Sequence, residues 1–114
     1  MDGKLVGIHH AALRVADVDE AVERWCRQFG LTLRERLADR AYLRCAFEDY
    51  SLELIVGDEP GFDHAGWELA PGLDPGETGL SGEAVERPGR EPSLMLLDPD
   101  GYGAEIVPYA EREQ

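Results

Sequence analysis

The sequence predicts an α+β domain built from two related halves. Three observations favour this fold class. The chain has 114 residues, which is enough for one compact domain with a real core but not for two independent domains. The first half shows strand and helix patterns in the order β-α-β-β-β. Similar residues also recur at near-constant offsets, since His64 follows His10 by 54 positions and Glu105 follows Glu53 by 52.

The first half, about residues 5–57, opens with a strand at residues 7–15, where apolar and polar residues alternate loosely. A helix follows, because Asp17 can cap it, Glu20 completes a capping box and Gly30 supplies a left-handed stop. We expect its apolar stripe to bury one face of the strands, with Val22, Trp25 and Phe29 as contacts. Three further short strands are predicted at residues 31–36, 41–47 and 51–56.

The second half, about residues 62–109, repeats this pattern with strands at 62–69, 93–97 and 102–107. Residues 71–82 are rich in glycine and proline, so the helix of this half is predicted to be lost or reduced. The back of its strands would then be bare, which favours a homodimer or a larger oligomer that covers it. The alternative is that residues 70–92 fold back over these strands without regular secondary structure, with Leu73, Leu80 and Val85 as the side chains that cover the apolar face.

Composition excludes several kinds of partner. The 24 acidic and 11 basic residues give a formal charge of −13, which argues against nucleic acid and anionic membrane surfaces. No apolar run approaches the roughly 20 residues of a membrane span. The amino-terminal residues lack the pattern of a secretory signal, so we expect a cytoplasmic protein. In that reducing compartment, Cys26 and Cys45 are expected to be buried free thiols.

Four side chains of metal-ligand type lie on strand faces opposite apolar residues, if side chains alternate along each strand. They are His10, Glu53, His64 and Glu105. Two imidazoles with one or two carboxylates suit Fe, Mn, Ni, Co or Zn and leave positions for water or substrate. Each residue alone is weak support, because a lone strand histidine or glutamate is more often structural or solvated. A pocket without metal therefore stays open as an alternative. His9 points to the opposite face and is left out of the site.

Several segments together resemble the vicinal oxygen chelate superfamily. These are His10-Ala-Ala-Leu-Arg-Val, Phe29-Gly-Leu, Leu52-Glu-Leu, Asp63-His-Ala and Asp98-Pro-Asp-Gly-Tyr-Gly-Ala-Glu-Ile. The superfamily includes glyoxalases, extradiol dioxygenases, fosfomycin-resistance transferases, methylmalonyl-CoA epimerase and bleomycin-binding proteins. The resemblance implies that each half is a βαβββ module and that the two modules form a half-open barrel around a metal. It implies His10, His64 and Glu105 as ligands, with Glu53 at the fourth position that glyoxalases and epimerases use.

The resemblance also implies a metal-dependent enzyme that acts on two neighbouring oxygens of a small molecule. Glu53 or Glu105 could serve as the base in a proton transfer, and Arg14 and Tyr102 are candidate substrate contacts. The first half looks most like extradiol dioxygenases, but the chain has two modules rather than four, and Met95 stands about where those enzymes have a tyrosine. Lyase, isomerase and oxygenase chemistry therefore stay open. The alternative is a non-catalytic small-molecule or antibiotic-binding protein of the resistance type, in which Trp67 and Tyr102 stack on the ligand.

Overall fold

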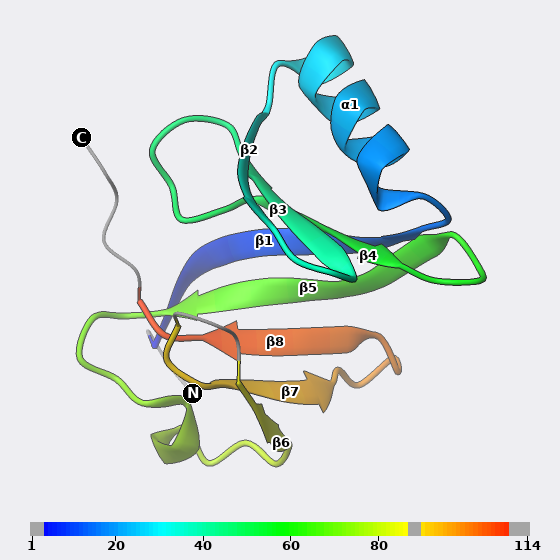
Figure 1. Ribbon diagram of the computed structural model, residues 1–114. Coiled ribbons are helices and arrows are strands. Elements are labelled where there is room, and N and C mark those ends of the chain that lie inside the picture. Colours follow the sequence, from blue (N-terminus) through cyan, green and yellow to red (C-terminus); the bar gives the residue numbers. More distant parts are fainter. Residues whose placement is uncertain (1–3, 87–89, 110–114) are drawn as a thin grey trace. The chain divides into compact units, whose positions relative to one another are not determined.

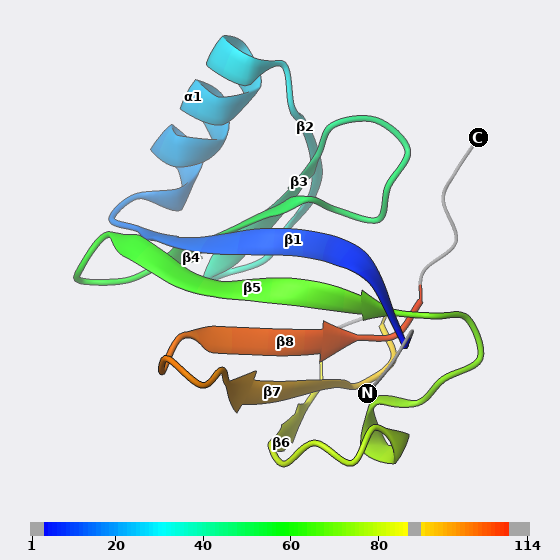
Figure 2. The same ribbon diagram turned by 180° about the vertical axis from the view of Figure 1, so that it is seen from behind.

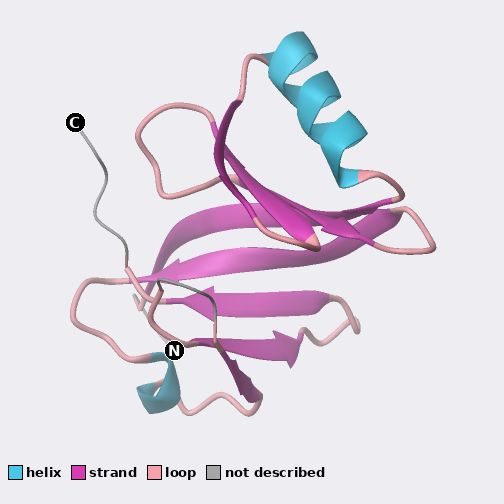
Figure 3. Ribbon diagram, in the orientation of Figure 1, coloured by secondary structure: helices cyan, strands magenta, loops and turns pink. Residues whose placement is uncertain are grey.

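The computed structural model describes residues 4–86 and 90–109. Within these residues it has one α-helix, one short 3-10 helix and eight strands (Figure 3). In chain order they are β1 (Leu5–Val15), α1 (Val18–Phe29), β2 (Thr32–Arg36), β3 (Arg40–Arg44), β4 (Leu52–Val56), β5 (Gly61–Leu69), η1 (Pro75–Glu77), β6 (Glu83–Val85), β7 (Ser93–Leu97) and β8 (Gly103–Val107). The chain divides into a first unit, residues 10–63, and a second unit, residues 4–9 with 64–109. The predicted module boundaries, 5–57 and 62–109, stay a prediction.

The first unit is a four-stranded sheet with a helix on one face. Its strands follow the order β2-β3-β4-β1, with β1 parallel to β4 and the other pairs antiparallel. Helix α1 packs on the strands (Figure 1), and Val18 and Ala21 join Leu43, Leu52 and Leu54 in one buried core. Since Leu52 and Leu54 face the helix, the residue between them is directed to the opposite face of the sheet. The predicted alternation in β4 is therefore confirmed.

The helix begins and ends where the sequence predicts. The Asp17 carboxylate accepts a hydrogen bond from the Glu20 N–H at 3.1 Å. Gly30 adopts φ 73° and donates its N–H to the Cys26 carbonyl, which is a left-handed cap that favours glycine. One expectation is wrong, because Phe29 is 63% exposed and does not bury the strand face. As the last helical residue it stacks on Trp25, with ring centroids 4.8 Å apart.

The second unit has four strands of its own, called the second sheet below, and no α-helix among its described residues. Its strands follow the order β5-β8-β7-β6 (Figure 2), and β5 runs parallel to β8. The single turn η1 stands where the first unit has α1, so the predicted loss of the helix is confirmed. Strand β6 was not predicted. The loop before it passes so close to β7 that a Cβ on Gly82 would lie 2.5 Å from the Met95 carbonyl oxygen, so only glycine fits there.

Among the residues that the structure describes, which leave out 87–89, the back of the second sheet is incompletely covered. Its core is small, with Leu69, Leu94 and Ile106 buried and Trp67 and Leu96 packed against them. Beside this core an apolar groove of about 550 Å³ is lined by residues that include Leu5, Trp67, Leu80, Leu96, Leu97 and Ile106. Leu73 and Leu80 remain exposed and take no part in the core. Leu80 of the glycine- and proline-rich loop therefore lines the groove, and the cover by residues 70–92 stays a prediction, because part of that segment lies outside the described residues.

Two further expectations concern thiols and membranes. Cys26 and Cys45 are both free, as predicted. Cys26 is half-buried and Cys45 is exposed in the turn after β3, so the expectation that both are buried is wrong. Among the described residues, no helix has the length and apolar character needed to cross a membrane.

Glu48 stabilises the turn between β3 and β4 through its charge. Burial raises its pKa, but hydrogen bonds from the N–H groups of Cys45, at 2.6 Å, and Ala46, at 2.9 Å, outweigh burial and lower the pKa from 4.5 to about 2. A lowered pKa in the folded state means that the stabilisation is present above pH 4.5 and is lost as the pH falls toward 2.

We expect Glu48→Gln to lower the free energy of unfolding at pH 7 by about 1 kcal/mol, because a partly exposed charge–amide interaction is screened by solvent. Urea unfolding between pH 7 and pH 3 measures the difference in the free energy of unfolding between wild type and variant. This difference should become smaller below pH 4.5. The exposed residue Glu91 provides the control, as Glu91→Gln. A difference that stays constant with pH would contradict this account of the turn.

Candidate metal centre

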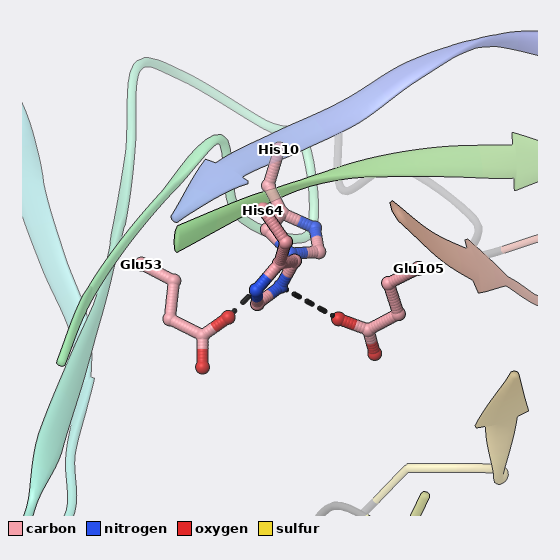
Figure 4. Close-up of side chains that lie close together, drawn as sticks. All are labelled: His10, Glu53, His64 and Glu105. Carbon is pink, nitrogen blue, oxygen red and sulfur yellow. Dashed lines mark hydrogen bonds and ion pairs between the residues drawn. The ribbon is translucent and has the colours of Figure 1, made fainter. Parts of the chain in front are cut away.

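The first unit holds a buried histidine–glutamate pair on adjacent parallel strands. His10 lies on β1 and Glu53 on β4, and the register places Glu53 opposite Ala12, two residues after His10. The His10 Nε2 atom lies 3.5 Å from Glu53 Oε1, and both residues are at most 1% exposed (Figure 4). Tyr50 packs on the His10 ring with centroids 4.7 Å apart, and sequence reasoning missed it. This packing limits the orientations that the imidazole can adopt.

The second unit holds an equivalent pair. His64 lies on β5 and Glu105 on β8, which are also adjacent and parallel. The His64 Nε2 atom lies 3.0 Å from Glu105 Oε1, and both residues are 1% exposed (Figure 4). On β8, Ile106 belongs to the core on the other face of the strand, as predicted. The same pair of residue types thus occupies the same kind of strand position in both units.

Each glutamate has a second partner that the sequence analysis did not identify. Arg40 Nη1 donates to Glu53 Oε2 at 2.7 Å, and Ser93 Oγ donates to Glu105 Oε2. Burial lowers the pKa of Arg40, but the hydrogen bonds to Asp39 and the charge of Glu53 outweigh it, so the pKa lies above its ordinary value. Arg40 therefore remains a cation beside Glu53. Ser93 is neutral and buried.

The two predicted substrate contacts lie in different surroundings. The Arg14 side chain donates from Nη1 to Asp63 Oδ1 at 3.0 Å and from Nε to the Glu59 carbonyl at 3.1 Å. It also lines a pocket of about 390 Å³ beside the helix, with Trp25 and Phe29. Tyr102 is exposed in the turn before β8. Asp63 therefore pairs with part of the Arg14 guanidinium, whose remaining N–H groups are the ones that could donate to an anion.

The chemistry of the donors fits a divalent metal. His10, Glu53, His64 and Glu105 offer two imidazole nitrogens and two carboxylate oxygens, which Fe, Mn, Co, Ni and Zn all accept, and all four residues are buried. A buried carboxylate costs free energy unless it is paired, hydrogen-bonded or bound to a metal. In each unit the imidazole and the carboxylate present Nε2 and Oε1 to one another, as two ligands of one ion would.

No family model matches the sequence, and no curated protein matches it at a significant level. Solved structures do match. An extradiol ring-cleaving dioxygenase from B. fuscum has 19% sequence identity and a TM-score of 0.79, with 97% of this chain and 34% of that chain covered. A variant of homoprotocatechuate 2,3-dioxygenase from B. fuscum has 18% identity and a TM-score of 0.77 over the same shares. The Mn(II)-bound glyoxalase from Novosphingobium aromaticivorans has 16% identity and a TM-score of 0.77, with 96% of this chain and 40% of that chain covered.

These likenesses establish the fold. The chain has the vicinal oxygen chelate fold of extradiol dioxygenases and glyoxalases, so the predicted fold class is confirmed. The chain spans only 34–40% of the length of these proteins. Their activities, substrates and partners therefore bear on this chain only as proposals.

Proposed function

We propose that this chain is a metal-dependent enzyme of the vicinal oxygen chelate type, in which His10, His64, Glu105 and Glu53 together bind one divalent transition metal. The observation that carries the proposal is the repetition of a fully buried histidine–glutamate pair at equivalent strand positions of both units. Each pair alone supplies two ligands, which is half of a four-ligand site. A manganese-bound glyoxalase with the same fold lends support to a metal of this class.

The substrate class we propose is a small molecule with two neighbouring oxygen atoms. One relative with this fold was solved as a complex with 3,4-dihydroxyphenylacetate, a catechol. A bound divalent ion would stabilise negative charge that develops on such oxygens. The chain itself would supply Glu53 or Glu105 as the base that accepts a proton. Arg14 and Tyr102 are proposed to contact the substrate, Arg14 as a cation for an anionic group.

Elemental analysis of protein purified without added metal tests the proposal directly. We expect close to one transition-metal ion per chain, and turnover of at least one member of a panel of small molecules with adjacent oxygens, 3,4-dihydroxyphenylacetate included. Dialysis against a chelator should abolish turnover, and readdition of the metal should restore it. Protein that binds these molecules but contains no metal and turns none over would instead be the non-catalytic binding protein. The free thiols Cys26 and Cys45 are compatible with the cytoplasmic location that we propose.

We also propose that the chain forms a homodimer through the back of the second sheet. The apolar groove there is rimmed by Leu97, which is 70% exposed, and a two-fold copy of the same surface is a common way to cover such a face. We expect Leu97→Glu to yield monomers, because a carboxylate cannot be buried without a partner. Light scattering at micromolar concentrations measures the mass. The matched control is Phe29→Glu, which changes an aromatic residue of similar exposure in the first unit. A wild-type protein that is monomeric at every concentration would rule out this interface.

A further inference from the structure

In both glutamates, one carboxylate oxygen faces the histidine and the other accepts a hydrogen bond from a second residue. In the first unit, Oε1 of Glu53 faces His10 at 3.5 Å, while Oε2 accepts the hydrogen bond from Arg40 at 2.7 Å. In the second unit, Oε1 of Glu105 faces His64 at 3.0 Å, while Oε2 accepts the hydrogen bond from Ser93. In each unit the oxygen on the imidazole side is thus the one that can serve a metal, and the other oxygen is engaged by a residue behind it.

Arg40 and Ser93 occupy equivalent positions of the repeat. Tyr42 lies opposite Glu53 in the antiparallel pair β3–β4, and Met95 lies opposite Glu105 in the antiparallel pair β7–β8. Arg40 stands two positions before Tyr42, and Ser93 stands two positions before Met95. Each is therefore the diagonal neighbour of its glutamate on the same face of the sheet. Ser93 follows Arg40 by 53 residues, between the offset of 54 for the histidines and 52 for the glutamates. The arrangement is therefore common to both copies.

We propose that Arg40 and Ser93 are positioning residues, which hold Glu53 and Glu105 so that each carboxylate binds the metal through Oε1 alone. The inference rests on the proposed function. A carboxylate ligand can bind through one oxygen or through both, and a hydrogen bond to its outer oxygen fixes its orientation and selects the first mode. Two carboxylates that each use one oxygen leave more of the coordination sphere for a substrate with two donor atoms.

The two positioning residues differ in charge, which makes the glutamates unequal. Arg40 is a cation, held by two hydrogen bonds to Asp39 at 3.2 and 3.1 Å, and it forms an ion pair with Glu53 Oε2 at 2.7 Å. Ser93 is neutral, so Glu105 keeps its charge for the metal. We therefore expect Glu105 to bind the metal more tightly than Glu53 does.

Cobalt(II) is the probe that tests this proposal, because its visible absorption depends on the coordination number. We expect Arg40→Met and Ser93→Ala each to lower Co(II) affinity about 10- to 100-fold, measured by competition with a chelating dye, and to change the absorption of bound Co(II). Arg40→Lys and Ser93→Thr, which keep a donor, should recover part of the affinity. In a Glu53→Gln background, Arg40→Met should change affinity by less than about twofold, since Arg40 acts through Glu53.

Arg27→Met is the matched control, because Arg27 also pairs with a glutamate, Glu23 on the helix surface, but with no proposed ligand. Circular dichroism confirms that each variant is folded. A wild-type protein that fails to bind Co(II) would overturn the proposed function. If the wild type binds Co(II), an affinity of Arg40→Met or Ser93→Ala that is unchanged or increased would overturn the positioning role alone. An equally large effect of Arg40→Met in the Glu53→Gln background would overturn it too.

Discussion

Purified His10→Ala, His64→Ala and Glu105→Ala proteins should each retain only a small fraction of the metal that the wild type contains. Each substitution removes one donor from the proposed shell of four, and the fall in affinity should exceed the roughly 10- to 100-fold that loss of an outer hydrogen-bond partner causes. Elemental analysis of the purified variants, together with titration of the apo-proteins, measures both occupancy and affinity. Glu53→Ala should lose less metal than Glu105→Ala, because the ion pair with Arg40 makes Glu53 the weaker of the two proposed carboxylate ligands.

His9→Ala is the matched control for these variants. His9 adjoins His10 in β1 and is also buried, so its substitution disturbs the same strand without removing a proposed ligand. It should keep the wild-type metal content. Full retention of metal by any two of the three ligand variants would contradict the proposed site, whereas loss of metal from His9→Ala alone would point to a ligand set other than the one proposed.

Replacing Leu54 with alanine should produce a large loss of stability in the first unit. Leu54 lies on β4 and is fully buried in the core that α1 covers, and truncation of such a leucine typically costs about 2–5 kcal/mol through lost burial and the cavity left behind. Urea unfolding monitored by circular dichroism gives the change in the free energy of unfolding. Leu33→Ala, at a leucine on β2 that is 42% exposed, should cost about 1 kcal/mol or less. Equal costs at the two positions would show that the core does not lie where the structure has it.

Local chemistry made much of the first unit predictable. The helix was bounded correctly because both of its ends depend on neighbouring residues, Asp17 with Glu20 at the start and Gly30 at the end. The orientation of Glu53 was also accessible, since two leucines flank it in β4 and a strand alternates its faces. Strand β6 was missed because its three residues, Glu83–Val85, carry no alternation and owe their conformation to pairing with β7.

The partners of the glutamates could not be predicted from local pattern alone. Arg40 is 13 residues from Glu53, and Ser93 is 12 residues from Glu105, so each contact depends on the register of an antiparallel pair. A shift of one residue in that register would turn Arg40 or Ser93 to the opposite face of its strand. The exposure of Phe29 was likewise inaccessible, because helical periodicity says which face is apolar but not how far along the helix the sheet extends.

Strand β1 is shared between the units, and this affects how the chain could be divided. Residues 4–9 belong with the second unit, where the Lys4 carbonyl accepts a hydrogen bond from the Ala70 N–H at 2.8 Å, while residues 10–15 belong with the first. A cut between β4 and β5 would therefore leave residues 4–9 on the amino-terminal piece, although these residues belong to the unit that the carboxy-terminal piece forms. Neither piece could satisfy all of its backbone hydrogen bonds without the other. We therefore expect two fragments cut at this place to depend on one another for their structure, which is the property that a split reporter uses.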